Sequence, residues 1–172
     1  MSSTDITIRQ AEARDVTDLT SLLGELFALE QDFCFEPEVQ RQGVEALLAN
    51  KRAMLLVAEL KGQVLGMCTA QLLTSTAEGG DAALVEDVVV SAEHRGKSLG
   101  RKLLAALESW AEDMGVTRLQ LLADAENSPA LGFYERLGWR MTQLICLRKR
   151  LDVSPLDTIP AHPLADHMET ES

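Results

Sequence analysis

Four of the sixteen lysine and arginine residues in this 172-residue chain lie close together, at Arg95, Lys97, Arg101 and Lys102. The apolar pattern predicts a strand before this stretch and a helix after it. Main-chain N–H groups at the start of such a helix point outward, with the positive end of the helix dipole behind them. A phosphate group would be attracted by the N–H groups and by the basic side chains. The stretch therefore predicts a phosphate site, and the alternative is a solvated basic loop.

Glycines in the same stretch bear on the kind of phosphate that it could bind. Gly96 and Gly100 allow a phosphate to approach the main chain closely. Gly96-Lys97-Ser98 matches the end of the ATP-binding P-loop, but that motif also requires a glycine at the position of Ser91. The Gly-x-Gly-x-x-Gly motif of dinucleotide-binding proteins follows none of the predicted strands. Neither motif therefore accounts for this stretch.

The elements that position these residues are predicted to alternate in an α/β order. Strands are expected at Ile6–Ile8, Ala53–Leu60, Gln63–Leu73, Ala82–Val90, Thr117–Ala123 and Trp139–Leu147. Helices are expected after Asp15, from Pro37, from Leu99 to Met114, and from Ser128 to Gly138. Lys61-Gly62 predicts a hairpin turn, and Thr74–Asp81 predicts a loop. This order predicts a mixed central β-sheet flanked by about four helices.

Composition and charge exclude several classes of function. With 16 basic and 27 acidic residues the net charge is −11, which argues against binding to nucleic acid or to an anionic membrane surface. The longest apolar run, Ala53–Ala58, is too short for a membrane-spanning helix. Met1–Gln10 lacks the apolar run of a signal peptide, and three widely spaced cysteines favour reduced thiols. We expect a soluble, cytoplasmic protein.

The composition changes near Leu151, so we expect one domain over residues 1–150 and a Pro-rich acidic extension over residues 151–172. The extension holds three of the five prolines and five acidic residues, but no lysine or arginine. His162 and His167 lie in it without a third nearby ligand, which is more typical of a solvated tail than of a metal site. No metal is expected.

The strand and the basic stretch together resemble the acetyl-CoA motif of the GNAT acyltransferase superfamily. In that family a strand is followed by Gln or Arg, two variable residues, Gly, one variable residue, and Gly or Ala. Arg95 and Gly100 match this pattern, whereas Ser98 stands where the family usually has its first glycine. Asn127–Trp139 is similar to the family segment Asn-x-x-Ala-x-x-Phe-Tyr-x-x-x-Gly-Phe. The resemblance covers about Ile6–Arg150 and implies the GNAT fold.

The resemblance also implies acetyl-CoA as cosubstrate, with no metal. It assigns the acetyl-CoA site to Val88, Val89, Val90, Arg95, Gly96, Lys97, Ser98, Leu99, Gly100, Asn127 and Tyr134. In the family, the strand that carries the three valines diverges from its neighbour, and its main chain binds the pantetheine arm. We expect ordinary helical angles at Ser98, so that its hydroxyl can add a phosphate contact.

Two residues are expected to carry the chemistry. Tyr134, the only tyrosine of the chain, falls at the general-acid position of the family, where a neutral phenol can protonate a leaving thiolate. The alternative is an aromatic residue packed beside Phe133. Glu86 is expected to be the base, acting through water, and the alternative is that it only holds a cationic amine by charge. Asp87 should face the opposite side of the strand and serve a structural role.

The acceptor is expected to be a primary amine of a small molecule, acetylated directly in a ternary complex. Acceptor specificity in the superfamily comes mainly from the segment between the first two helices, which points to Glu30, Asp32 and Phe33. Carboxylates beside aromatic rings suit an ammonium group, although two core phenylalanines in a loop would give the same pattern. The alternatives are a protein lysine or N-terminal acetyltransferase and a non-catalytic acyl-CoA-binding module. A homodimer is compatible with the family.

Overall fold

The computed structural model describes residues 6–30, 32–149 and 151. The first of two units in the chain ends at Met141, and every helix and strand of the described residues belongs to it. The strands are β1 (Thr7–Gln10), β2 (Ala53–Leu60), β3 (Gln63–Ser75), β4 (Gly80–Val90) and β5 (Leu119–Leu121). The helices are α1 (Val16–Phe27), α2 (Pro37–Ala49), α3 (Leu99–Asp113) and α4 (Ser128–Arg136).

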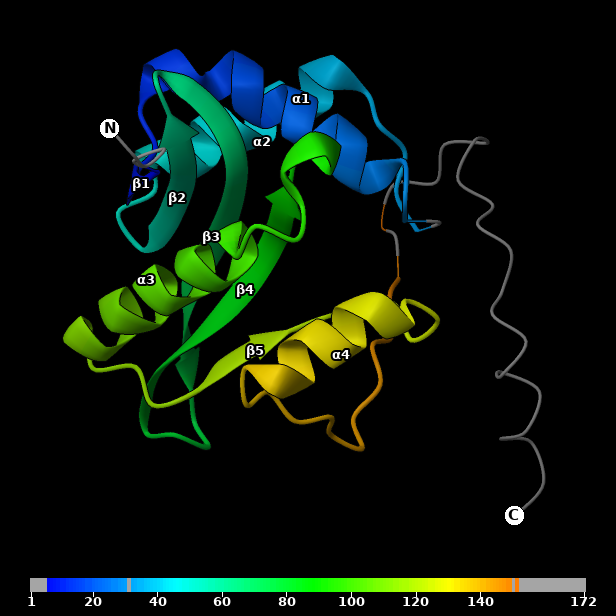
Figure 1. The fold of residues 1–172 in the computed structure, drawn as a ribbon. Helices are drawn as coiled ribbons and strands as arrows, with labels where there is room; N and C mark the ends of the chain where they lie inside the picture. The colour runs from blue at the N-terminus through cyan, green and yellow to red at the C-terminus, as the bar shows by residue number, and fades with distance from the viewer. Residues whose placement is uncertain (1–5, 31, 150, 152–172) are drawn as a thin grey trace. The chain divides into compact units, whose positions relative to one another are not determined.

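The five strands form one mixed sheet in the order β1-β2-β3-β4-β5 (Figure 1). The first three pairs are antiparallel, and β4 pairs with β5 in parallel. Lys61 and Gly62, between β2 and β3, both have positive φ angles, as a tight two-residue hairpin turn requires. The predicted mixed sheet flanked by four helices is confirmed.

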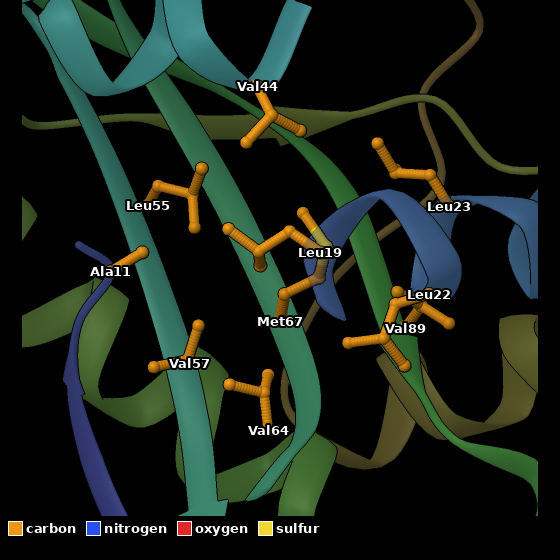
Figure 2. Close-up of a cluster of buried hydrophobic side chains, with 10 residues drawn as sticks. All are labelled: Ala11, Leu19, Leu22, Leu23, Val44, Leu55, Val57, Val64, Met67 and Val89. Carbon is orange, nitrogen blue, oxygen red and sulfur yellow. The ribbon is translucent and has the colours of Figure 1, made fainter. Parts of the chain in front are cut away.

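Helices cover both faces of the sheet, and the burial of β2 follows from this. Leu55 and Val57 pack in one cluster with α1 and α2, while Leu56 and Ala58 pack in a second cluster with α3. Figure 2 shows the first cluster. Successive residues of a strand point to opposite faces, so a strand covered on both sides buries a continuous apolar run. Each fully buried leucine contributes about 1.5–3 kcal/mol to folding.

Two segments have a different structure from the one that the sequence predicts. The segment Thr74–Asp81 is not a long loop, because β3 continues to Ser75 and β4 begins at Gly80. The strand expected at Trp139–Leu147 is wrong, since residues 139–149 contain no strand. Its apolar side chains Met141, Leu144, Ile145 and Leu147 are between 72% and 88% exposed. An alternating pattern becomes a strand only where a neighbouring strand supplies hydrogen bonds, and in the described part of the chain this segment has no such partner.

Candidate functional site

A β-bulge interrupts the pairing of β3 with β4. Between two regular pairs, β4 holds Asp87 and Val88 where β3 holds only Cys68. Asp87 takes the extra torsion, with a φ of 51° in the left-handed region. That conformation costs a residue other than glycine about 1–2 kcal/mol. Bulges of this kind occur next to active sites, where they redirect a side chain.

The bulge places two acidic side chains of β4 beside the same face of β3. Thr69 Oγ1 donates a hydrogen bond to Asp87 Oδ2 over 3.3 Å, and Gln71 Nε2 donates to Glu86 Oε2 over 3.5 Å. Thr69 and Gln71 are two residues apart, so their side chains leave β3 on one face. The expectation that Glu86 and Asp87 face opposite sides is therefore wrong, because strict alternation stops at the bulge.

The two carboxyl groups differ in their surroundings. Glu86 is exposed, whereas Asp87 is partly buried. Burial, together with the charges of Glu86 and Glu30, raises the pKa of Asp87 to about 6, against the opposing effect of the hydrogen bond from Thr69. A carboxyl group with this pKa is mostly ionised at pH 7 and takes up a proton more readily than an ordinary aspartate.

A cavity of about 450 Å³ lies beside Asp87, among α1, α2 and the sheet. Its apolar wall consists of Leu23, Phe27, Val39, Val44, Ala46 and Leu47. Gly43 and three neutral amide side chains, Gln40, Asn50 and Gln71, complete the lining together with Asp87. The cavity falls within the size range of small-molecule sites and has their usual composition, mostly apolar with a few polar groups.

The residues expected to contact the acceptor lie near this cavity but do not line it. Phe33 stacks on Phe27, with ring centroids 5.3 Å apart and ring planes at 22°, and Phe27 is part of the cavity wall. Glu30 acts through its charge, which raises the pKa of both Asp87 and Tyr134. Asp32 is exposed. Direct contact of these three residues with an acceptor stays a prediction.

The strand that carries the three valines diverges from its neighbour. β4 pairs with β5 only from Ala83 to Val85, opposite Leu119–Leu121. From Glu86 to Val90, β4 has no strand partner on its β5 side among the described residues (Figure 1). The main chain of Val88, Val89 and Val90 therefore runs along an open sheet edge, which is the arrangement that the resemblance implies.

The basic stretch follows directly at the end of β4. Arg95 Nε donates a hydrogen bond to the main-chain oxygen of Val90 over 3.0 Å, and Arg95 Nη2 lies 3.9 Å from Glu25 Oε2. Gly96 has a φ of 75°, in the left-handed region that glycine adopts without strain. Lys97 is exposed. The loop thus turns back toward the strand end and keeps its positive charge at the surface.

The backbone conformation expected at Ser98 is wrong. Ser98 has φ 61° and ψ 15° and is the N-cap of α3. The tight turn from the loop into the helix forces these left-handed angles, which explains why the family usually has glycine here. The Ser98 hydroxyl makes no capping hydrogen bond. The first N–H groups of α3 therefore have no side-chain cap, and they can take an anionic ligand.

The next two residues fix the start of α3 against the rest of the molecule. Leu99 is 1% exposed, so its side chain belongs to the core and only its main chain can meet a ligand. A Cβ atom at Gly100 would lie 3.2 Å from Cζ of Phe133 in α4. Glycine at this position permits the close approach of α4 to α3.

Asn127 has a structural role at the start of α4. Its Oδ1 atom accepts a hydrogen bond from the main-chain nitrogen of Ala130 over 3.1 Å, so Asn127 is the N-cap of α4. Ser128, from which the sequence predicts the helix, is its first helical residue. The contact of Asn127 with CoA stays a prediction.

Tyr134 packs in an aromatic group on α4. Its ring makes edge contacts with Phe133 at 5.3 Å and with Trp139 at 5.9 Å. Burial, followed by the Cys68 and Glu30 side chains, raises the pKa of Tyr134 to about 12. The phenol therefore stays protonated at pH 7. The packing that the alternative interpretation expected is present, and it leaves the phenol able to donate a proton.

Sequence reasoning missed the position of Asp87 in the lining of the cavity and the apolar wall beside it. The available signal was the pair of adjacent carboxylates, Glu86 and Asp87, between Val85 and Val88. In the part of the chain that the structure describes, no three His, Cys, Asp or Glu side chains are grouped to hold a metal ion. His162 and His167 lie outside the described residues. Within residues 6–30, 32–149 and 151, no helix combines the length and apolar character needed to cross a membrane.

Comparisons with known proteins bear on this site. A family model described as the acetyltransferase (GNAT) family matches residues 21–139. A Bacillus subtilis (strain 168) protein, named a putative alanine N-acetyltransferase of ribosomal protein bS18, is 30% identical over 92 residues. That alignment covers 54% of this chain and 57% of the relative, so the chain spans little more than half of that curated relative.

Solved structures share the fold at low sequence identity. A possible acetyltransferase from Clostridium difficile 630 has a TM-score of 0.77 and 21% identity, covering 86% of this chain and 99% of its own. The aminoglycoside N-acetyltransferase AAC(6')-Iy, solved in complex with CoA, has a TM-score of 0.75 and 16% identity, covering 88% of this chain and 98% of its own. At these identities the likeness shows a common fold.

Proposed function

Because the chain belongs to the GNAT acetyltransferase family, we propose that it transfers the acetyl group of acetyl-CoA directly to a primary amine of a small molecule in a ternary complex. One observation carries the proposal. A cavity of about 450 Å³, with the carboxyl group of Asp87 in its lining, lies next to the bulge where β4 runs apart from β5. An amine in this cavity would lie beside a proton acceptor and close to the open edge of β4.

The residues ahead of α3 fit the diphosphate of acetyl-CoA. The first turn of α3 holds no acidic side chain and has no side-chain cap. Exposed Arg95, Lys97, Arg101 and Lys102 surround the same helix start. Diphosphate oxygens would accept hydrogen bonds from the N–H groups of the first turn and meet the positive end of the helix dipole. Val88, Val89 and Val90 would bind the pantetheine arm through their main chain.

When bound, acetyl-CoA supplies an activated thioester carbonyl. The residues of this chain then have to remove a proton from the acceptor and supply one to the leaving sulfur. We propose that Asp87 accepts the proton that the ammonium group must lose before its nitrogen can attack. The Tyr134 hydroxyl would hold the proton that the departing thiolate receives. Its raised pKa keeps that proton in place at neutral pH.

Glu86, the base that the resemblance implies, is exposed and interacts with Gln71 at 3.5 Å. This position suits the alternative role, in which Glu86 attracts a cationic amine by its charge. Asp87 lines the cavity, and its raised pKa makes it a stronger proton acceptor than an ordinary aspartate. We therefore favour Asp87 as the proton acceptor and Glu86 as the electrostatic partner.

A second candidate acceptor is a protein N-terminus. The name of the Bacillus subtilis relative, an alanine N-acetyltransferase of a ribosomal protein, favours it. The two candidates differ in what must enter the site, a whole small molecule or the first residues of a peptide.

Free thiols at Cys34, Cys68 and Cys146 support the further proposal of a cytoplasmic location. A homodimer is proposed on the family resemblance alone.

Release of free CoA from acetyl-CoA, followed with a thiol reagent, tests the proposal. The acceptor panel should contain small primary amines, lysine-containing peptides and peptides with N-terminal alanine. We expect amine-dependent CoA release, and mass spectrometry should find the acetylated amine. If acetyl-CoA raises the melting temperature but no amine or peptide is acetylated, the protein is an acyl-CoA-binding module rather than an N-acetyltransferase.

A further inference from the structure

The cavity beside Asp87 has apolar walls on two sides, one from α1 and one from α2. Leu23 and Phe27 come from α1, and Val44 and Leu47 come from α2. Phe33 extends this apolar surface by stacking on Phe27. An acceptor that displaces water from these walls gains binding free energy in proportion to its own apolar area. The body of the acceptor should therefore be apolar.

The charge in and around the cavity has one sign. Asp87 is the only ionisable group among the described residues that line it. The charges that act on the pKa of Asp87 are those of Glu86 and Glu30, and both are negative. The lining residues that the structure describes include no lysine, arginine or histidine. A cation is therefore favoured at one point, next to Asp87, and a second charge of either sign would meet neutral groups.

We propose that the acceptor is a monoamine, a molecule with a single ammonium group at Asp87 and an apolar alkyl or aryl body between α1 and α2. This inference rests on the proposed acetyltransferase function and names the substrate class of the same site. The neutral amides of Gln40, Asn50 and Gln71 line the cavity as well, and they can accept a hydroxyl or amide group on that body.

Two other classes of acceptor fit this lining poorly. A polyamine or an aminoglycoside carries several ammonium groups, and those lying along the leucine, valine and phenylalanine walls would have no partner of opposite charge among the described residues of these walls. A phosphorylated or carboxylated amine would place an anion in a cavity whose described lining has no cationic residue, under the negative charges of Asp87, Glu86 and Glu30. Both arrangements place a charge against apolar walls without a partner of opposite sign on them, and that charge loses part of its hydration without compensation.

Gly43 offers a direct test of where the acceptor body lies. It sits on α2 and lines the cavity, and a Cβ atom added to it has no atom within 4 Å. A larger side chain therefore fits there without a clash, and replacing glycine inside a helix favours folding. Gly43→Leu should fill part of the cavity, while Gly43→Ala should leave most of it open and serves as the matched control.

The experiment compares the wild-type protein with both variants in the CoA-release assay. The panel holds short and long monoamines (propylamine, hexylamine and phenethylamine), spermidine, kanamycin, glucosamine 6-phosphate and a peptide with N-terminal alanine. For the wild type we expect kcat/KM to rise from propylamine to hexylamine and phenethylamine, and to be at least tenfold lower for the polycations and the phosphate ester. Gly43→Leu should raise KM at least tenfold for the two larger monoamines, with a smaller change for propylamine and an unchanged kcat.

The outcomes separate this inference from the function on which it rests. Acetylation of spermidine, kanamycin, glucosamine 6-phosphate or the peptide in preference to the monoamines would overturn the monoamine assignment and leave the acetyltransferase function standing. An unchanged KM for phenethylamine in a folded Gly43→Leu variant would also overturn it. The absence of CoA release with every compound, in a protein that acetyl-CoA fails to stabilise against heating, would instead remove the proposed function itself.

Discussion

Thr69 Oγ1 donates a hydrogen bond to Asp87 Oδ2 across 3.3 Å, and this bond joins a buried residue of β3 to the bulged residue of β4. The bond holds one carboxylate oxygen of Asp87 in a fixed position beside the cavity. It also opposes the rise in the pKa of Asp87 that burial causes. The site thus contains a carboxyl group that is oriented by a neighbour yet remains a better proton acceptor than an ordinary aspartate.

Asp87→Asn is expected to lower kcat by about 10²-fold or more, because an amide cannot accept the proton of the ammonium group. In the wild type, activity should rise with pH through the pKa of Asp87, about 6, as the carboxyl group ionises. The groups that act on this pKa are Glu86 on β4, Glu30 beyond α1 and Thr69 on β3. Initial rates between pH 5 and pH 9 measure both effects.

Glu86→Gln is the matched control for that experiment, since it changes the neighbouring carboxylate in the same way. It should raise KM for the amine and keep the acidic limb of the pH profile, moved to lower pH because the charge of Glu86 raises the pKa of Asp87. If the limb near pH 6 persists in Asp87→Asn and disappears in Glu86→Gln, Glu86 is the base that the resemblance implied.

Asp87→Asn should at the same time stabilise the fold at pH 7. An aspartate in an unfolded chain has a pKa of about 3.9, and folding raises the pKa of Asp87 to about 6. Between these values the folded protein binds more protons than the unfolded one, so the free energy of unfolding falls as the pH rises from about 4 to about 6. The ionised group then costs about 1–3 kcal/mol at pH 7, and asparagine removes that cost.

Urea denaturation at pH 7 and pH 4 checks this expectation. The variant should be more stable than the wild type at pH 7, and the difference should shrink at pH 4, where Asp87 is protonated in the folded protein. A variant that is less stable than the wild type at pH 7 would support the structural role first expected for Asp87.

Tyr134→Phe is expected to lower kcat by about 10²-fold or more, with little effect on CoA affinity. Phenylalanine keeps the ring contacts with Phe133 and Trp139, so the fold should be preserved. The pKa of Tyr134 is raised to about 12, so its deprotonation should not reduce activity between pH 7 and pH 10. Calorimetry with CoA and steady-state kinetics separate binding from chemistry. A variant with the wild-type kcat would exclude the phenol as proton donor.

Ser98→Gly is expected to raise the free energy of unfolding by about 0.5–1 kcal/mol. The left-handed angles at Ser98 cost a residue with a Cβ atom about 1–2 kcal/mol, and the greater freedom of glycine in the unfolded chain offsets about half of the gain. Thermal denaturation should show a melting temperature higher by about 2–4 °C.

Ser98→Ala provides the comparison, because alanine keeps the Cβ atom and loses only the hydroxyl group. It should give no such gain. Equal melting temperatures for the glycine and alanine variants would mean that the backbone at this position is not strained.

The sequence predicts those parts of the structure that depend on local patterns. The spacing of Leu99, Leu103 and Leu107 predicts a helix with one buried face, and these three residues are at most 1% exposed. Lys61-Gly62 predicts the hairpin for an equally local reason. Predictions fail where the geometry is not specified by the pattern within one element. The torsion of Ser98 is set by how the loop meets α3, and the apolar alternation after Trp139 cannot supply its own strand partner.

Asp87 illustrates the same limit within the site. Alternation along β4 assigns Glu86 and Asp87 to opposite faces only if the pairing with β3 is continuous. The bulge is a property of the register between two strands, and no pattern within β4 alone specifies it. The choice of Glu86 over Asp87 as base followed from the family resemblance, and the packing around each carboxyl group became visible only in the folded chain.

The ladder between β3 and β4 is complete on either side of the bulge, with Thr69 opposite Glu86 and Met67 opposite Val89. Removing Asp87 altogether would leave Val88 opposite Cys68 and keep every flanking residue on its present face. The sheet therefore has one residue more in this strand than its hydrogen-bonding register uses. A single-codon deletion would yield a regular, unstrained ribbon that lacks the carboxylate, so under the proposed mechanism this extra amino acid would serve the chemistry and not the architecture.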